Sequence, residues 1–232
     1  MRNLETVHRN QLPGVADLDP SALDARKTIA YEHPKVLATI LRDQVQLAIW
    51  KRTLPLCLTT WLNNLPTHKL PNLRILARHP ELKEQLQRAL DHCEMPEGPM
   101  RRILVADIGE LVSHFAAIVD SDYVDVRLEA VTHNSCWKFH RDYVEARLLT
   151  TYLGPATEWV QPDYSEQALR EQTKYSGPIE RMETHHVSIF KGSCLGTDSG
   201  VVHRSPPIAG TGQTRVLLCL NKQTATSPAP TE

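Results

Sequence analysis

The stretch YVEARLLTTYLGPATEWV, residues 143–160, decides the fold class of this chain. It contains two strand candidates, Tyr143–Leu153 and Thr157–Val160, which the turn-forming pair Gly-Pro separates. Further short strands are expected at Tyr123–His133, His185–Phe190, Gly200–Arg204 and Thr214–Asn221. A series of short strands with glycine and proline turns is typical of a β-sandwich or barrel.

The first half of the chain differs from the second in its glycine content. Residues 1–120 hold three of the ten glycines, and because glycine serves tight turns, this half is expected to be the more helical one. The strongest helix candidate is Met100–Val119, whose apolar residues form one stripe. Other helices are expected at Pro55–Leu65 and Glu81–His92, and apolar alternation over Gln44–Arg52 predicts a strand.

Together these patterns predict an α+β chain. Residues 1–120 are expected to form a mostly helical region that packs on a C-terminal β-sandwich or jelly roll. Residues 121–222 would be the jelly-roll core that binds metal. Residues 223–232 contain mainly threonine, alanine, serine and proline, so a disordered tail is expected there.

Composition excludes several classes of protein. The formal net charge of −1 gives no excess of basic residues, which makes a nucleic-acid partner an unfavourable hypothesis. The longest apolar runs, Phe115–Val119 and Val216–Leu220, are far shorter than the ~20 residues of a membrane span. The five cysteines form no CxxC pair, and the first ten residues lack the apolar core of a signal peptide. A reduced, cytoplasmic protein is therefore expected.

The most specific group of chemistry-bearing residues is His140-Arg141-Asp142 followed by His203. Two histidines and one carboxylate can bind Fe(II) on one side and leave the opposite positions open for a co-substrate and O2. His140 and Asp142 are two residues apart, so both side chains point the same way from a strand end, and a neighbouring strand can supply His203. The competing interpretation is a set of hydrogen-bonded core histidines.

The order of these segments resembles the core of the Fe(II)/2-oxoglutarate dioxygenases, which are double-stranded β-helix (jelly-roll) enzymes, over residues 121–222. The segments that carry it are His140-x-Asp142, Arg147–Tyr152, Gly154–Trp159, His186–Gly192, Val202–Arg204 and Arg215–Leu218. A narrower resemblance, over most of the chain, is to a bacterial family known as domain of unknown function 1826. Its segments are Val45–Arg52, Trp137–Asp142, Leu149–Val160 and Val202–Pro206.

The wider resemblance implies an oxygenase that hydroxylates a small molecule or a protein, with Fe(II) and 2-oxoglutarate as cofactors. His140, Asp142 and His203 would hold the iron. Arg215 would bind the distal carboxylate of 2-oxoglutarate, because a guanidinium offers two parallel donors; a surface ion pair is the other interpretation of this arginine. Further co-substrate candidates are Arg147, Thr151 and Tyr152, and the substrate candidates are Arg204, Trp137 and Trp159. Substrate identity and oligomeric state are not legible in the sequence.

Two other hypotheses remain open at this stage. The run Gly192-Ser193-Cys194-Leu195-Gly196 has the form of a nucleophile elbow, which with His203 would make a thiol hydrolase using Cys194. Such an elbow needs a strand, a sharp turn and then a helix. Alternatively, a jelly roll could bind Zn(II) without catalysis, through nitrogen and sulfur ligands from Cys136, His133, His140 and His203.

Overall fold

Two β-sheets form the centre of the protein in a computed structural model that describes residues 27–78, 81–195 and 200–230. The described strands of the large sheet lie in the order β1-β2-β8-β5-β10-β4-β3, and those of the small sheet in the order β7-β6-β9. The bounds are β1 Thr28–Tyr31, β2 Leu47–Trp50, β3 Asn72–Arg78, β4 Tyr123–Val131, β5 Ala146–Leu153, β6 Glu158–Trp159, β7 Glu180–Arg181, β8 Val187–Lys191, β9 His203–Arg204 and β10 Arg215–Lys222. Only β1 and β2 pair in parallel; the other described neighbours are antiparallel.

From β4 onward the chain passes back and forth between the two sheets. After β4 in the large sheet, His140 forms an isolated bridge with β9 of the small sheet, and the chain then returns to the large sheet as β5. Strands β6 and β7 belong to the small sheet, β8 to the large one, β9 to the small one and β10 to the large one. Segments far apart in sequence therefore face one another across the space between the sheets.

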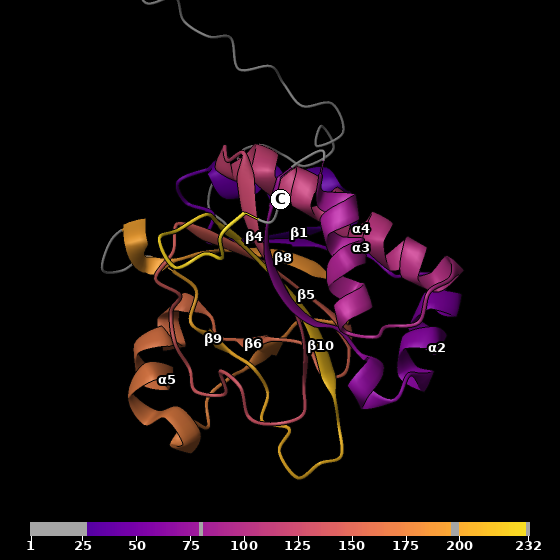
Figure 1. Ribbon diagram of the computed structural model, residues 1–232. Helices are drawn as coiled ribbons and strands as arrows, with labels where there is room; N and C mark the ends of the chain where they lie inside the picture. Colours follow the sequence, from indigo (N-terminus) through magenta and orange to yellow (C-terminus); the bar gives the residue numbers. More distant parts are fainter. Residues whose placement is uncertain (1–26, 79–80, 196–199, 231–232) are drawn as a thin grey trace, which may run out of the picture.

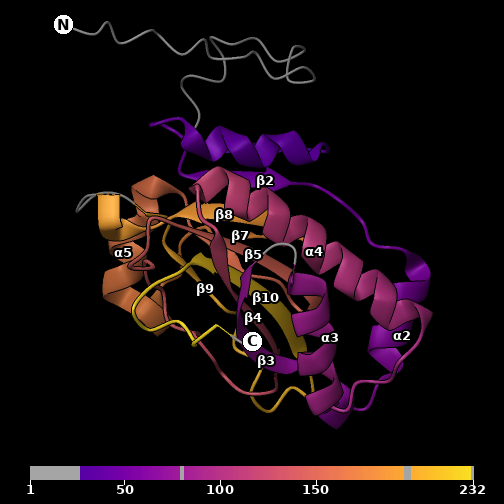
Figure 2. The same ribbon diagram turned by 45° about the horizontal axis from the view of Figure 1, so that its top comes forward.

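Helices cover the outer faces of this sandwich. Helices α2 (Leu56–Asn64), α3 (Leu82–His92) and α4 (Pro99–Val119) lie on one side, and α5 (Ser165–Glu171) lies on the other, beside β6 and β9 (Figures 1 and 2). Alternation along β10 divides its side chains between two cores. Val216, Leu218 and Leu220 pack with the helices, whereas Leu217 and Cys219 pack between the sheets.

Helix α4 begins with a proline in its first turn, where the missing N–H has no intrahelical acceptor to lose. It ends at Asp120, whose φ of 47° is left-handed. Its buried stripe lies in the same core as β4 and β10, so the predicted helix and its apolar face are confirmed. The helices expected at 55–65 and 81–92 are confirmed as well, within one residue at each end.

The described part of the amino-terminal region, residues 27–78 and 81–120, is less helical than the sequence predicts; residues 1–26 lie outside the described residues. Besides β2, it contributes β1 and β3, and all three strands belong to the large sheet. Strand β3 buries four of its seven residues but carries arginine and alanine, which have weak strand preference, so its pattern does not predict a strand. The described part of the tail is also ordered: the Ser227 hydroxyl donates to Asp125, and Pro230 bridges to Leu76 of β3. The predicted disorder is wrong for residues 223–230, and residues 231–232 lie outside the described residues.

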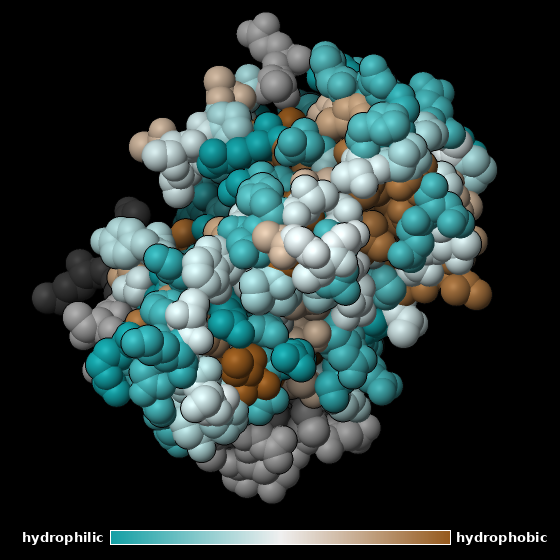
Figure 3. Space-filling model, turned by 90° about the horizontal axis from the view of Figure 1, so that it is seen from below, coloured by the Kyte–Doolittle hydropathy of each residue, from teal (hydrophilic) through white to brown (hydrophobic). Residues whose placement is uncertain are grey.

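The surface shows where apolar side chains remain accessible. Seen from below, hydrophobic side chains gather mainly toward the side on which α2 lies (Figure 3). Leu56 of α2 is 80% exposed. None of the helices in the described part of the chain is long and apolar enough to cross a membrane.

Phe115 gives a direct test of the packing between helix and sheet. Its side chain is fully buried among the apolar residues of α4, β4 and β10. Phe115→Ala should lower the free energy of unfolding by about 3–5 kcal/mol, because it removes a large buried side chain and leaves a cavity. Urea unfolding followed by circular dichroism measures the loss. Ser113→Ala, at an exposed position of the same helix, should change it by less than about 0.5 kcal/mol; equal losses for the two variants would contradict this packing.

Candidate metal centre

Three side chains converge between the two sheets. His140 bridges to His203, the first residue of β9, and Asp142 follows two residues later. The Nε2 atom of His203 lies 3.3 Å from Asp142 Oδ2, and that of His140 lies 3.6 Å from Asp142 Oδ1. Each residue offers one ligand atom within 4.8 Å of the others, and no other described residues form such a group of three or more.

Backbone carbonyls orient both histidine rings. His140 Nδ1 lies 2.8 Å from the Lys138 carbonyl oxygen, and His203 Nδ1 lies 3.0 Å from that of Val201. Because a carbonyl can only accept, each Nδ1 is the protonated nitrogen, and in a neutral ring each Nε2 carries a lone pair facing Asp142. Metal-binding histidines are held in the same way. Two lone pairs and a carboxylate directed at one point repel each other unless a cation or a proton lies between them.

The two oxygens of Asp142 have different surroundings. Oδ1 accepts from Arg147 Nη1 at 2.5 Å, whereas Oδ2 is buried and has no hydrogen-bond partner. Burial alone would raise the pKa of this carboxyl, but the rings of His140 and His203 and the charge of Arg147 hold the pKa well below its usual range. Asp142 is therefore an anion, with one oxygen held in place and the other free to bind a cation.

The structure assigns Arg147 a different contact from the predicted one. Its Nη1 binds Asp142 and its Nε donates to Asn221 Oδ1 at 2.7 Å, so two of its donors hold residues of the protein. The prediction of Arg147 as a co-substrate ligand is wrong, because its position on β5 places the guanidinium against the carboxylate of Asp142. It orients that carboxylate instead.

Arg215, at the start of β10, is an interior residue. It is only 1% exposed, its Nε donates to the Pro155 carbonyl oxygen at 2.7 Å, and its Nη2 is buried without a partner. Burial lowers its pKa to about 10, which leaves the group charged at neutral pH. It forms no ion pair with a carboxylate of the described residues. The interpretation of Arg215 as a surface ion pair is therefore wrong, and a buried guanidinium is left with donor capacity for an anion.

The remaining co-substrate candidates, Thr151 and Tyr152, lie on opposite faces of β5. Thr151 is buried and pairs with Leu217, on the face of the large sheet that looks toward the small sheet. Tyr152 points the opposite way, into the core beneath the helices, and its hydroxyl donates to Asp107 at 2.5 Å. The prediction of Tyr152 as a co-substrate ligand is therefore wrong, because successive side chains of a strand lie on opposite faces.

Arg204 is also directed away from the three converging side chains. It follows His203 in β9, so its side chain lies on the outer face of the small sheet. There its Nε donates to Glu158 at 2.8 Å, and its guanidinium lies over the Phe139 ring. Arg181 binds the other oxygen of the same buried carboxylate. The prediction of Arg204 as a substrate contact is wrong. Arg204 stabilises the small sheet instead.

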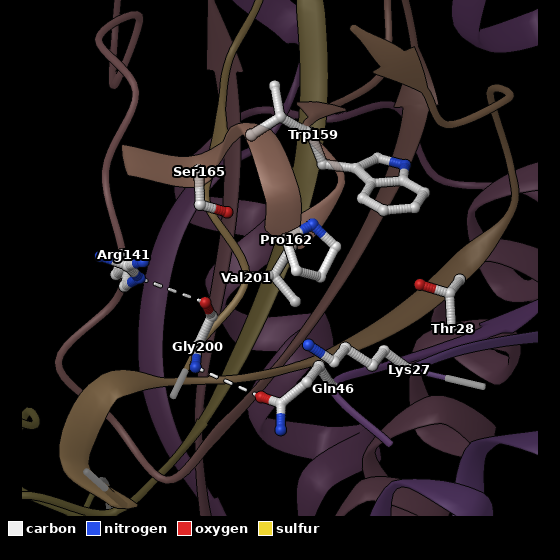
Figure 4. A pocket seen from close by; sticks show the side chains of 10 residues that line it. Lys27, Thr28, Gln46, Arg141, Trp159, Pro162, Ser165, Gly200 and Val201 are labelled. Atoms are coloured by element: carbon white, nitrogen blue, oxygen red, sulfur yellow. Dashed lines mark hydrogen bonds between the residues drawn. The ribbon is translucent and has the colours of Figure 1, made fainter. Parts of the chain in front are cut away.

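The two predicted tryptophans have different environments. Trp159 is 6% exposed, pairs with His203 in the strand register and packs between the sheets. Trp137 lies half-buried in the loop before His140, and its role remains a prediction. Trp159 also lines a cavity of about 110 Å³ (Figure 4). Its lining further includes Lys27, Thr28, Gln46, Arg141, Val160, Pro162, Ser165, Gly200 and Val201.

This cavity adjoins the converging side chains through shared segments of backbone. Arg141, between His140 and Asp142, donates to the Gly200 carbonyl at 3.3 Å, and the Gly200 N–H donates to Gln46 at 3.3 Å (Figure 4). Lys27 and Arg141 give the lining a positive character. No sequence pattern indicates Lys27, Gln46 or Arg141 as lining residues, because only the fold brings the amino-terminal strands beside the residue between His140 and Asp142.

The other site hypotheses find less support in the geometry. Among the described residues, neither His133 nor Cys136 belongs to the group that could hold a metal, and both are exposed. Cys194 is exposed in a short 3-10 turn, Ser193–Leu195. Only residues 196–199 separate this turn from Gly200, too few for the helix of a nucleophile elbow.

The apo-protein should respond to pH through His140. The Asp142 carboxylate raises the pKa of His140 while burial opposes it, so the folded value exceeds the unfolded value of about 6.5. This stabilisation is complete below about pH 6.5 and is lost as pH rises through the folded pKa. In EDTA, the melting temperature of wild type relative to Asp142→Asn should therefore fall as the pH rises above about 6.5. A difference that is constant with pH would refute the coupling.

A family model described as "Protein of unknown function (DUF1826)" matches residues 31–221. This chain belongs to the DUF1826 family. The narrower resemblance found in the sequence is thereby confirmed, and no curated protein matches the chain.

Solved structures give distant matches to this DUF1826 chain. A prolyl-4-hydroxylase of Pseudomonas putida is 10% identical, with 84% of this chain and 99% of that chain covered and a TM-score of 0.42. A full-length protein of Neurospora crassa, solved in complex with alpha-KG, is 14% identical, with 84% and 83% covered and a TM-score of 0.40. EvdO2 of Micromonospora carbonacea var. aurantiaca is 12% identical, with 80% and 90% covered and a TM-score of 0.36.

Proposed function

We propose that this protein is an Fe(II)- and 2-oxoglutarate-dependent oxygenase that hydroxylates a small molecule or a protein side chain. The observation that carries the proposal is one arrangement between two sheets: a His-Asp-His group with an unpartnered carboxylate oxygen, and a buried arginine with an unpartnered donor. Two histidines and one carboxylate suit Fe(II) and leave positions open for other ligands. A buried guanidinium suits the distal carboxylate of 2-oxoglutarate.

The fold supports the same proposal. The passage of the chain between the large and small sheets from β4 to β10 supports the wrap of a double-stranded β-helix, or jelly roll. In this wrap β5 and β10 are neighbours in the large sheet, while the segment of His140 and β9 are neighbours in the small one. The metal ligands and Arg215 thus come from both walls of one interior.

Each residue of the site has a defined task in this proposal. His140, Asp142 and His203 hold the metal, the Lys138 and Val201 carbonyls fix the ring orientations, and Arg147 fixes the carboxylate. Arg215 receives the co-substrate. When bound, Fe(II) and 2-oxoglutarate supply the O2 chemistry that inserts oxygen into a C–H bond. The protein binds and orients these groups and keeps bulk water from His203 and Asp142, whose side chains are 5% and 7% exposed.

The substrate would reach the metal from the side of His140. The side chain of His140 is 34% exposed, so this is the open wall of the site. Trp159 and Thr151 remain candidates for lining the interior, and Trp137 for its entrance.

The five cysteines form no disulfide, which fits a reducing cytoplasm.

A metal-binding protein without catalysis is the second candidate function. The same histidine and carboxylate donors suit Zn(II), so the ligands alone do not distinguish the two functions. Arg215 favours the oxygenase, because a site that only stores or senses metal has no use for a buried arginine with a free donor.

Thermal unfolding of the metal-stripped protein tests the proposal. A ligand that binds only the folded state raises its melting temperature. We expect 2-oxoglutarate to raise it when Fe(II), kept anaerobic, or Mn(II) is present, and to have no effect in EDTA or in His203→Ala. If Zn(II) raises the melting temperature and 2-oxoglutarate adds nothing with any metal, the oxygenase proposal fails and the metal-binding function stands.

A further inference from the structure

The turn at Gly192–Ser193, directly after β8, binds the segment that carries Asp142. The Ser193 N–H donates to the Asp142 carbonyl oxygen at 2.8 Å, and the Ser193 hydroxyl donates to the same oxygen at 3.1 Å. The Gly192 N–H donates to the Glu145 carbonyl oxygen at 3.0 Å. Together with the hydrogen bond from the Cys194 N–H to the Val144 carbonyl oxygen at 3.4 Å, these contacts connect the end of β8 to residues 142–145.

Gly192 allows an approach that no other residue would permit. A Cβ atom at this position would lie 2.0 Å from the Val144 carbonyl oxygen and 2.7 Å from that of Asp142. Both neighbours are backbone atoms, so a side chain could be accommodated only if the segment moved. The requirement for glycine here comes from close backbone contact.

No strand ladder supports this segment, so it is held by individual contacts, among them those of this turn and the hydrogen bond from Arg141 to the Gly200 carbonyl oxygen. Residues 141–145 lie between the bridge at His140 and the start of β5, and they belong to no strand. Arg147 holds the Asp142 side chain through Oδ1, while Ser193 holds the backbone of the same residue through its carbonyl. Asp142 is therefore fixed at both ends, and its free oxygen Oδ2 is directed toward the histidines.

We propose that Gly192 and Ser193 are positioning residues that clamp Asp142 in place as a metal ligand. The inference rests on the proposed function, since it requires metal at His140, Asp142 and His203. It also gives a role to the Gly192-Ser193-Cys194 motif, which the sequence alone likens to a nucleophile elbow. In this role the motif acts through the close backbone approach of Gly192 and through the N–H and hydroxyl of Ser193.

The test measures Fe(II) affinity by anaerobic calorimetry, together with the melting temperature of each apo-variant in EDTA. Ser193→Ala should weaken Fe(II) binding about tenfold, as loss of a group that orients a metal ligand does. Ser193→Thr, which keeps the hydroxyl, should restore it. Gly192→Ala should weaken binding about a hundredfold or more, because it displaces the Asp142 segment itself.

Ser188→Ala is the matched control. The Ser188 hydroxyl also donates to a backbone carbonyl at 3.1 Å, that of Leu149, and it is buried in the same strand that leads into the clamp. This variant should lower the apo melting temperature at least as much as Ser193→Ala and leave Fe(II) affinity within about twofold of wild type.

The outcomes separate this proposal from the proposed function. If wild type binds no Fe(II), the proposed function fails. Suppose that wild type binds Fe(II) and that the melting curve of Ser193→Ala shows a folded protein. If this variant then binds Fe(II) as well as wild type does, the clamp is overturned and the proposed function stands. Equal losses of affinity in Ser193→Ala and Ser188→Ala would likewise overturn the clamp, because they would show a general effect of stability. Should Gly192→Ala fail to fold, the two serine variants decide.

Discussion

Asp142→Ala should lose Fe(II) binding by a factor well above about a hundred, the largest effect expected from any single change. Loss of a group that merely orients a ligand costs about 10–100-fold, and this variant removes a proposed ligand itself. Asp142 supplies the only carboxylate of the converging group, and its buried Oδ2 has no other partner. His140 and His203 alone form a weaker, uncharged pair of ligands.

Anaerobic calorimetry with Fe(II) measures this loss. Asp163→Ala is the control, because it removes an exposed carboxylate beside α5 and should leave the affinity unchanged. If Asp142→Ala binds Fe(II) as tightly as wild type, metal binding at this group is excluded and both proposed functions lose their basis.

Arg215→Ala should weaken 2-oxoglutarate binding about thirtyfold or more and leave Fe(II) affinity nearly intact. Truncating one partner of a buried, charge-assisted pair costs about 2–5 kcal/mol, and about 1.4 kcal/mol corresponds to tenfold. The tasks are divided, since Asp142 would bind metal and Arg215 would touch only the co-substrate. Calorimetry with 2-oxoglutarate in the presence of Mn(II) gives the affinity.

Arg204→Ala is the matched control for this experiment. It removes a partly buried arginine that follows the proposed metal ligand His203 in sequence, but one that is directed to the outer face of the small sheet, where it binds Glu158. Its 2-oxoglutarate affinity should match wild type. If Arg215→Ala is silent, or if both arginines have equal effects, Arg215 is no co-substrate ligand and the metal-binding function is favoured.

Local patterns were sufficient for much of the fold. The apolar stripe on Met100–Val119 predicts α4, because apolar residues that recur with a period of 3.6 over about twenty residues are typical of an amphipathic helix. The order of short strands after residue 121 gives the two-sheet core. Strands β1 and β3 were missed, because they are the edge strands of the large sheet, where pairing with distant strands rather than sequence pattern creates the strand.

The converging residues were predictable as a set, whereas the faces on which their neighbours lie were not. His140 and Asp142 share a side of one short segment, so spacing alone brings them together. Tyr152 and Arg204 were misplaced, because a shift of one residue moves a side chain to the opposite face and the sequence of a short strand does not fix that phase. The contact of Arg147 with Asp142 depends on how β5 lies against the preceding loop, which is a tertiary property.

The burial of Arg215 could not be predicted from the sequence either. At the start of a strand an arginine is ordinarily exposed, and nothing adjacent in the sequence buries it. The Pro155 carbonyl that receives its Nε lies 60 residues away, in the turn between β5 and β6. Its burial follows from the antiparallel pairing of β10 with β5, which brings that turn over the start of β10.

The most direct test of the central claim is an anaerobic titration of wild type with Fe(II) and 2-oxoglutarate, followed by visible absorption. Fe(II) bound to a chelating keto acid gives a weak charge-transfer band, which neither component gives alone and which Zn(II) cannot give. We predict that the band appears only when both are present and saturates at one equivalent of Fe(II) per chain. Tight binding of Fe(II) or Zn(II) with no band at saturating 2-oxoglutarate would contradict the account.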